Sequence, residues 1–227
     1  MTAIALDSSN NVYLAGYFTN SSDNAGPDFT PAPAITSNSD VSKKNTLALK
    51  LDSTGATQWA KSFGGSGATD AEGTSITTDS LGYVYVGGKF SGNNLTLPAL
   101  TKIGTQDAMI LKLSTSSGSP MWSKAYGGSG ATADAYKLTI NQRGQSVLSG
   151  SFISANLTTP ALNTSGAVEA LLVRDETTSV PIITSPTSTS LAPTSATLGG
   201  DVADGGTSLT ATGVVYAVTL TNSNPAL

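Results

Sequence analysis

Three carboxylates near the glycine-rich stretches of the sequence are the side chains best suited to bind a metal ion. They are Asp70, Glu72 and Asp134. Ca²⁺ takes several oxygen ligands and is held well by carboxylates. However, the chain contains no Asp-x-Asp-x-Asp-Gly loop. A weak calcium site is therefore the only cofactor we consider, and we favour the simpler interpretation that these residues are solvated loop acids.

A second set of polar residues stands at one recurring position, just before an apolar strand-like run. Its members are Asn45, Asp107 and Glu169. If the three runs gather around a common axis, these side chains could contact a ligand at one mouth of the assembly. A short polar side chain before a strand also commonly accepts hydrogen bonds from neighbouring backbone N–H groups. We favour this turn-capping role.

The residue types that the chain lacks exclude several kinds of chemistry. There is no histidine and no cysteine, so a Ser-His-Asp triad, a Cys/His zinc or copper site, a disulfide and a thiol nucleophile are all impossible. The net charge is −4 and the pI is about 4.6, which is the wrong sign for binding a phosphate backbone. We predict no catalytic residues, no enzyme activity and no nucleic-acid partner.

The elements that must position these residues come from an internal repeat. The segment 3–18 returns at 75–90 and, less faithfully, at 137–152. A second segment, 47–67, returns at 109–130, and its third copy begins near residue 170 without the tryptophan and the glycine pair. We therefore predict three repeats that cover about 1–67, 68–130 and 131–178. The first repeat is longer by ten residues in the loop around 23–40.

Each repeat predicts four short strands. In the first repeat these are residues 4–6, 12–17, 46–51 and 57–62, separated by turns rich in Asp, Asn, Ser and Gly. Four strands at a fixed period are typical of a β-propeller blade. The predicted fold class is all-β: three propeller-type blades in an open arc, followed by a partial β-sandwich.

Two glycine pairs end the fourth strands of the first two repeats: Gly64 with Gly65, and Gly127 with Gly128. Glycine-rich loops can hold phosphate groups, but these lack the lysine and the following helix of a phosphate-binding loop. We expect them to be tight connections from one blade to the next.

Three runs of the sequence resemble a known family. The runs IALDSSNNVYLAGYF, LKLDSTGATQWAKSFGGSG and AEGTSITTDSLGYVYVGGKF resemble the bacterial SBBP-type β-propeller repeat over residues 3 to 176. The resemblance implies a large exported or cell-surface protein with many repeats, often followed by Ig-like modules. The tryptophan stretch is also similar to the motif of quinoprotein propellers. That similarity implies that Trp59 and Trp122 dock each blade onto the next, and no residues for the quinone cofactor can be placed.

The last quarter of the chain differs in composition. Residues 179–192 are rich in Pro, Ser and Thr and predict an extended linker. Residues 193–227 hold two strand-like runs around an Asp-Gly-Gly turn and predict an incomplete Ig-like or fibronectin type III-like sandwich, since a complete one needs about 100 residues.

The three blades raise the question of how the arc is completed. Propellers typically close with four to eight blades, so we expect a piece of a longer protein whose remaining blades complete the ring. The alternative is self-association, with six blades in a dimer. No apolar run approaches the ~20 residues of a membrane span, and no signal peptide is visible at Met1. We expect an extracellular or cell-surface location, with any export signal lying outside this chain.

Three functional hypotheses follow. One is a purely structural stalk, which would be supported if no ligand is found and many tandem sandwiches follow Leu227. The other two are more specific. The first is a non-catalytic module for binding, adhesion or scaffolding, with a protein or glycan ligand. The second is a part of an extracellular enzyme, carbohydrate-active or quinoprotein-like, whose active residues lie on missing blades. Ligand binding without turnover would favour the first, and stabilisation by calcium or a quinone would favour the second.

Overall fold

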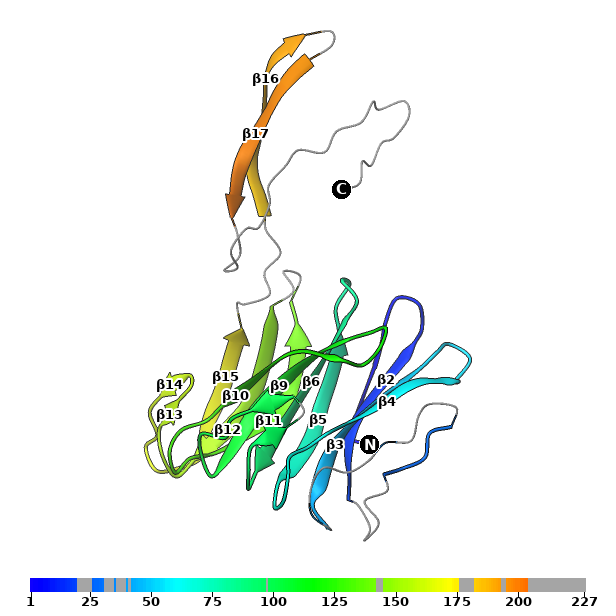
Figure 1. The fold of residues 1–227 in the computed structure, drawn as a ribbon. Coiled ribbons are helices and arrows are strands. Elements are labelled where there is room, and N and C mark those ends of the chain that lie inside the picture. The colour runs from blue at the N-terminus through cyan, green and yellow to red at the C-terminus, as the bar shows by residue number, and fades with distance from the viewer. Residues whose placement is uncertain are drawn as a thin grey trace. The chain divides into compact units, whose positions relative to one another are not determined.

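The computed structural model describes residues 1–19, 26–30, 35, 40, 42–96, 98–141, 145–175, 182–192 and 195–203 (Figure 1). These residues form strands and turns without a helix, so the described part also contains no helix that could span a membrane. The all-β prediction is confirmed. The chain divides into a first unit of residues 1–142 and 146–175 and a second of residues 143–145 and 176–227.

The first blade is a four-stranded antiparallel sheet. Its strands are β1 (Ala3–Leu6), β2 (Val12–Thr19), β3 (Lys44–Leu51) and β4 (Thr57–Phe63), in that order across the sheet. The β1–β2 turn needs a left-handed residue, and Asn10 supplies it with a φ of 61°. The four strands agree with the predicted ones to within a few residues.

The second blade repeats this arrangement. It contains β5 (Asp70–Thr78), β6 (Tyr83–Ser91), β9 (Gln106–Ser114) and β10 (Pro120–Tyr126), all paired antiparallel. The loop between β6 and β9 folds into a small hairpin of β7 (Leu95–Thr96) and β8 (Ala99–Leu100). This hairpin was not predicted, although its sequence recurs in the third repeat.

The third blade has three strands in the described residues: β11 (Thr132–Ile140), β12 (Ser146–Ile153) and β15 (Glu169–Asp175). Between β12 and β15 lies a second small hairpin, β13 (Leu157–Thr158) with β14 (Ala161–Leu162). A fourth strand would begin near residue 182 at the repeat spacing. The residues found there pair elsewhere, because the third copy has lost the tryptophan and glycine motif that places such a strand.

The second unit contains an antiparallel hairpin of β16 (Ile182–Ala192) and β17 (Ser195–Ala203). In the structure, residues 182–192 of the segment predicted as an extended linker, 179–192, form a strand paired with β17. Its β-branched residues, such as Ile182, Ile183 and Thr184, favour strand pairing over a free linker. The rest of the predicted sandwich, from residue 204 on, lies outside the described residues.

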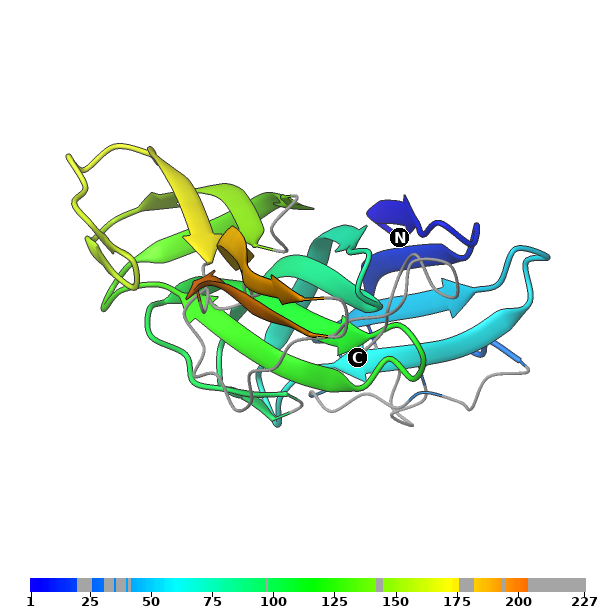
Figure 2. The same cartoon turned by 90° about the horizontal axis from the view of Figure 1, so that it is seen from above.

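The three blades follow one another in chain order, as the blue-to-yellow sequence of strands shows (Figure 2). The first strand of each blade packs on the preceding blade: β5 against β1, β2 and β3, and β11 against β5, β6 and β9. We call these two interfaces the first seam and the second seam. Each encloses its own apolar cluster. At the second seam a single parallel bridge between Thr132 and Gln106 also joins the second and third blades into one continuous sheet.

Candidate functional site

The first seam contains two of the carboxylates considered for calcium. Lys44 Nζ lies 2.6 Å from Glu72 Oε1, and Lys43 Nζ lies 3.3 Å from Asp70 Oδ2. The backbone N–H of Lys44 also donates to Asp70 Oδ1 at 2.8 Å. The lysines belong to the first blade and the acids to β5 of the second. The hydrogen bond and charge of Glu72 raise the pKa of Lys44 above its ordinary value, so the Lys44 amino group stays charged at neutral pH.

The third of these carboxylates makes the equivalent contacts at the second seam. Asp134 Oδ1, on β11, accepts hydrogen bonds from Lys89 Nζ at 2.8 Å and from Gln106 Nε2 at 3.0 Å. Burial lowers the pKa of Lys89, but the hydrogen bond and charge of Asp134 outweigh it, and the net pKa lies above the ordinary value.

These contacts give the acids a role in joining blades. Glu72 and Asp134 occupy the same repeat position, as do their donors Lys44 and Gln106. Among the described residues, no group of three or more acidic side chains is placed to hold a metal ion. A calcium site stays a prediction without geometric support in this part of the chain.

The recurring polar position before the third strand caps turns in the second and third blades. Asp107 is fully buried and accepts the backbone N–H groups of Ile103 at 2.5 Å and of Gly104 at 2.8 Å. Burial raises the pKa of its carboxyl group, although both N–H groups favour the ionised form. Glu169 accepts the N–H of Ser165 at 3.0 Å and the hydroxyl of the same residue.

The three members of this set differ in exposure. Asn45 and Asp107 are buried, so their side chains do not present a surface to a ligand. Glu169 is partly exposed and is the one member at which a ligand contact stays a prediction.

The glycine pairs are clamped by the small hairpin of the following blade. Gly64 O accepts the N–H of Thr96 at 3.0 Å, and Gly127 O accepts the N–H of Thr158 at 2.9 Å. A Cβ on Gly65 would collide with the carbonyl of Asn94, which shows why the backbone here admits no side chain. The structure thus places both pairs in blade-to-blade connections, without a helix following either of them.

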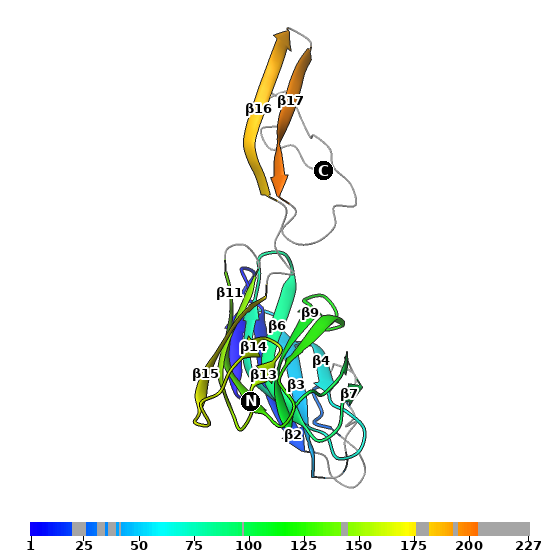
Figure 3. The ribbon, with the colours of Figure 1, turned by 90° about the vertical axis from the view of Figure 1, so that its left-hand side faces the viewer.

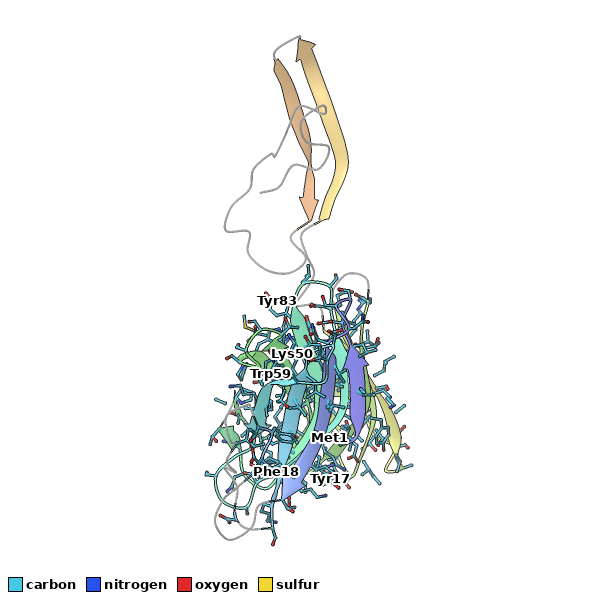
Figure 4. All side chains as sticks on the ribbon, turned by 90° about the vertical axis from the view of Figure 1, so that its right-hand side faces the viewer. Met1, Tyr17, Phe18, Lys50, Trp59 and Tyr83 are labelled. Carbon is cyan, nitrogen blue, oxygen red and sulfur yellow. The ribbon has the colours of Figure 1, made fainter. Side chains whose placement is uncertain are left out.

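Trp59 docks the first blade onto the second. Its ring is buried, with 5% of its surface exposed, and packs against Tyr13 at a centroid distance of 6.1 Å. Its Nε1 donates to Thr115 O, in the β9–β10 turn of the second blade, at 3.0 Å. Lys50 Nζ donates to the same carbonyl at 3.1 Å. Figure 4 shows Lys50 and Trp59 together on adjacent strands.

Trp122 holds the equivalent place at the second seam but is less enclosed. It packs edge-on against Tyr85, with ring centroids 6.2 Å apart. Its Nε1 is buried and has no hydrogen-bond partner among the described residues. Lys112, the counterpart of Lys50, lies 3.7 Å from the centroid of the Tyr83 ring, and burial lowers the pKa of its amino group.

A groove of about 530 Å³ opens beside this second seam. It lies between β10 and β15 and the loop after β8. Its lining includes Leu100, Ile103 and Val173 together with the basic residues Lys124 and Arg174. Sequence reasoning missed this groove, because its walls come from segments more than seventy residues apart and no local motif marks it.

Two threonines that the sequence analysis did not single out also join blades. Thr2 Oγ1 donates to Gly73 O at 2.6 Å, and Thr74 Oγ1 donates to Ala135 O at 2.7 Å. Both acceptors lie at bulges in the first strand of the next blade. The sequence does point to this pair, because Thr2 and Thr74 occupy the same position in the first and second repeats.

Comparison with known protein families supports the repeat. Residues 58–96 match the family model of the SBBP beta-propeller repeat. The match runs from β4 through the first seam to the end of β7, and so includes Trp59, both glycines of the first pair, Asp70 and Glu72. No curated protein matches the chain. The SBBP-type repeat is therefore confirmed for these residues, and the Ig-like or fibronectin-like domain stays a prediction.

Proposed function

We propose that this chain is a non-catalytic β-propeller repeat module that binds a glycan or protein ligand in an adhesive or scaffolding role. The proposal rests on the contacts that the polar residues of the chain make. The three acids singled out from the sequence contact the preceding blade, Trp59 contacts the following one, and Asp107 and Glu169 cap turns. Side chains committed in this way hold blades together and are not available as an acid–base pair.

The groove beside the second seam is the surface that suits a ligand. Binding sites are typically concave and mostly apolar, with a few polar groups that fix orientation. Leu100, Ile103 and Val173 supply the apolar wall, while Thr101 and Ser123 supply hydroxyl groups. Ile103 keeps 37% of its surface exposed, so its side chain is accessible to a bound molecule.

The proposed binding can be tested on a panel of purified bacterial and host polysaccharides and matrix proteins. We expect retention of at least one member of the panel, with no release of reducing ends or peptides. Ile103→Glu should reduce that retention at least tenfold, because it places a charge in the apolar wall. Leu81→Glu is the matched control, since Leu81 is also exposed but lies in the β5–β6 turn. Turnover of any member, or equal retention by both variants, would contradict the proposal.

We also propose that the module works outside the cell or on its surface. The support is compositional: only 11% of the residues are charged, and the remaining polarity comes largely from the uncharged hydroxyl groups of Ser and Thr. Digestion of intact source cells with a protease should remove the protein while leaving a cytosolic marker intact. Protection until the cells are lysed would overturn this location.

A further inference from the structure

Each blade of the first unit has two different faces. We call the face toward the preceding blade the leading face and the face toward the following blade the trailing face. At the first seam Ile76, on the leading face of the second blade, shares a buried cluster with Ala15 and Ala48 of the first. At the second seam Leu138 takes the place of Ile76: a Cβ on Gly87 would lie 3.1 Å from the Leu138 Cβ. The same docking is thus used twice.

The trailing face of the third blade repeats the docking positions but leaves them uncovered. Leu172 stands where Ala48 and Ile110 stand in the first two blades. Ala48 and Ile110 are completely buried, whereas 68% of the Leu172 surface is exposed. Tyr136 and Val168, on the same blade, are also more than half exposed. Figure 3 views the first unit from the side on which β15 lies.

The leading face of the first blade is the complementary case. Ile4 occupies the position of Ile76 and Leu138. Ile76 and Leu138 are each 6% exposed, but Ile4 is 65% exposed, and Leu6 beside it is 58% exposed. Figure 4 views this opposite side, where Met1 and Tyr17 are labelled. One chain therefore carries both an open leading strand and an open trailing face.

The rest of the leading face is already covered by the first blade itself. Phe29 and Ile35, from the long loop between β2 and β3, pack with Leu47 and Leu49 on β3. The open part is consequently the first strand, β1. At the two seams the corresponding strands, β5 and β11, contact the preceding blade. Leading-face residues of the later strands, such as Val86 and Leu111, also join the apolar cluster of the first seam.

The polar pattern at the third blade agrees with apolar docking. In the first two blades the position that donates to the acid of the next blade is Lys44 or Gln106. In the third blade that position is Val168. An aliphatic residue there needs no acidic partner.

We infer that the trailing face of the third blade docks β1 of a second copy of this chain, head to tail, as a third use of the blade-to-blade seam. Ile4 of one copy would pack on the surface formed by Leu172 and Ser149 of the other, because Ser149 stands at the position of Ala15 and Gly87. Such a contact is heterologous, so its two surfaces differ.

The mass of the whole chain in solution tests this inference. At about 100 µM, where an interface with micromolar Kd is nearly saturated, we expect a species of at least twice the 22.8 kDa chain mass by light scattering. Ile4→Lys and Leu172→Lys should each reduce that mass toward a single chain. Both residues are exposed, so the circular dichroism spectrum should stay unchanged, as should the Tm at concentrations low enough for the unmodified chain to be monomeric. Leu81→Lys, away from both faces, should assemble like the unmodified chain.

Mixing the two variants separates this arrangement from any symmetric one. The Ile4→Lys chain keeps an intact trailing face and the Leu172→Lys chain keeps an intact β1. An equimolar mixture should therefore recover a two-chain species that neither variant forms alone. A monomeric unmodified chain at 100 µM, or a mixture that stays monomeric, would overturn the inference. Ligand retention is measured separately, so a failure of the proposed function would not produce either result.

Discussion

The two seams are built from equivalent residues and are completed to different degrees. At the first, Thr115 O accepts hydrogen bonds from both Trp59 and Lys50. At the second, Trp122 Nε1 has no partner in the described part of the chain, and Lys112 faces aromatic rings instead. The comparison shows that a blade does not stabilise itself alone. Its outer tryptophan depends on a turn that the next blade supplies, as expected when each repeat is stabilised mainly by its neighbours.

Truncating the tryptophans should break this comparison most strongly. Trp59→Ala removes a buried ring and a hydrogen bond, and we expect it to lower the free energy of unfolding by about 4 kcal/mol. Trp122→Ala should cost about half as much, because that ring is less enclosed. Urea unfolding curves of the two variants measure the difference. Equal losses would show that the two seams are equally complete.

A milder pair of variants isolates the hydrogen bond. Phe keeps most of the ring packing but has no N–H donor. Trp59→Phe should therefore cost about 1 kcal/mol more than Trp122→Phe, which is the usual net value of one hydrogen bond. If Trp122→Phe proved the costlier change, an acceptor for Trp122 would have to exist.

The glycine connection at the second seam should give an effect second only to that of Trp59→Ala. A Cβ on Gly127 would collide with the carboxylate of Asp107, which also holds the N–H of Gly104. Gly127→Ala should lower the free energy of unfolding by about 3 kcal/mol through overpacking in a rigid site. The control is Gly55→Ala: Gly55 has a φ of 88° but open space around it, so backbone strain alone should cost about 1 kcal/mol.

The smallest expected effect concerns pH. Asp107 and Glu169 occupy the same repeat position, but their pKa values are shifted in opposite directions. The buried Asp107 has a raised pKa, so the folded state binds its proton more tightly than the unfolded state. Its contribution to stability is therefore least above that pKa and grows as the pH falls toward the ordinary value of 3.8. The pKa of Glu169 is lowered by the hydrogen bonds from Ser165, so its contribution is present above 4.5 and is lost as the pH falls through the lowered value.

Urea unfolding midpoints measured from about pH 7 to pH 3 should show both trends, because the ordinary pKa values of Asp and Glu lie within this range. Relative to the unmodified chain, Glu169→Gln should be destabilised at neutral pH, and this deficit should shrink in acid. Asp107→Asn should show the opposite trend, with a relative deficit that grows in acid. Parallel pH profiles for the two variants would refute the assignment of opposite shifts.

The sequence predicted the strands better than it predicted the seams. Strand positions follow from local alternation, as in Leu47, Leu49 and Leu51, and from turn residues such as Asp52 and Gly55, so the first blade was placed to within a few residues. The acceptor for Trp59 is a backbone carbonyl 56 residues away. Every residue has a backbone carbonyl, so no pattern of side-chain types could have identified this acceptor.

The lysine partners of the acids were missed for a related reason. Lys89 and Asp134 are 45 residues apart, and only the stacking of one blade on the next brings them together. The sequence shows where the acids are but not which residues surround them, which is why solvated acids and a calcium site were both considered. The strand β16 was likewise missed, because a composition rich in Pro, Ser and Thr concealed its β-branched residues, whereas β17 coincides with the first of the two predicted strand-like runs.

The long loop of the first blade bears on the order in which the chain acquires structure. Phe29 and Ile35 cover Leu47 and Leu49, and all four residues lie within the first 49 positions. A nascent chain can therefore shield these leucines before the second blade has emerged from the ribosome. Each later blade can then pack on a sheet that has already formed, so that synthesis from the N-terminus and assembly of the arc proceed in the same direction.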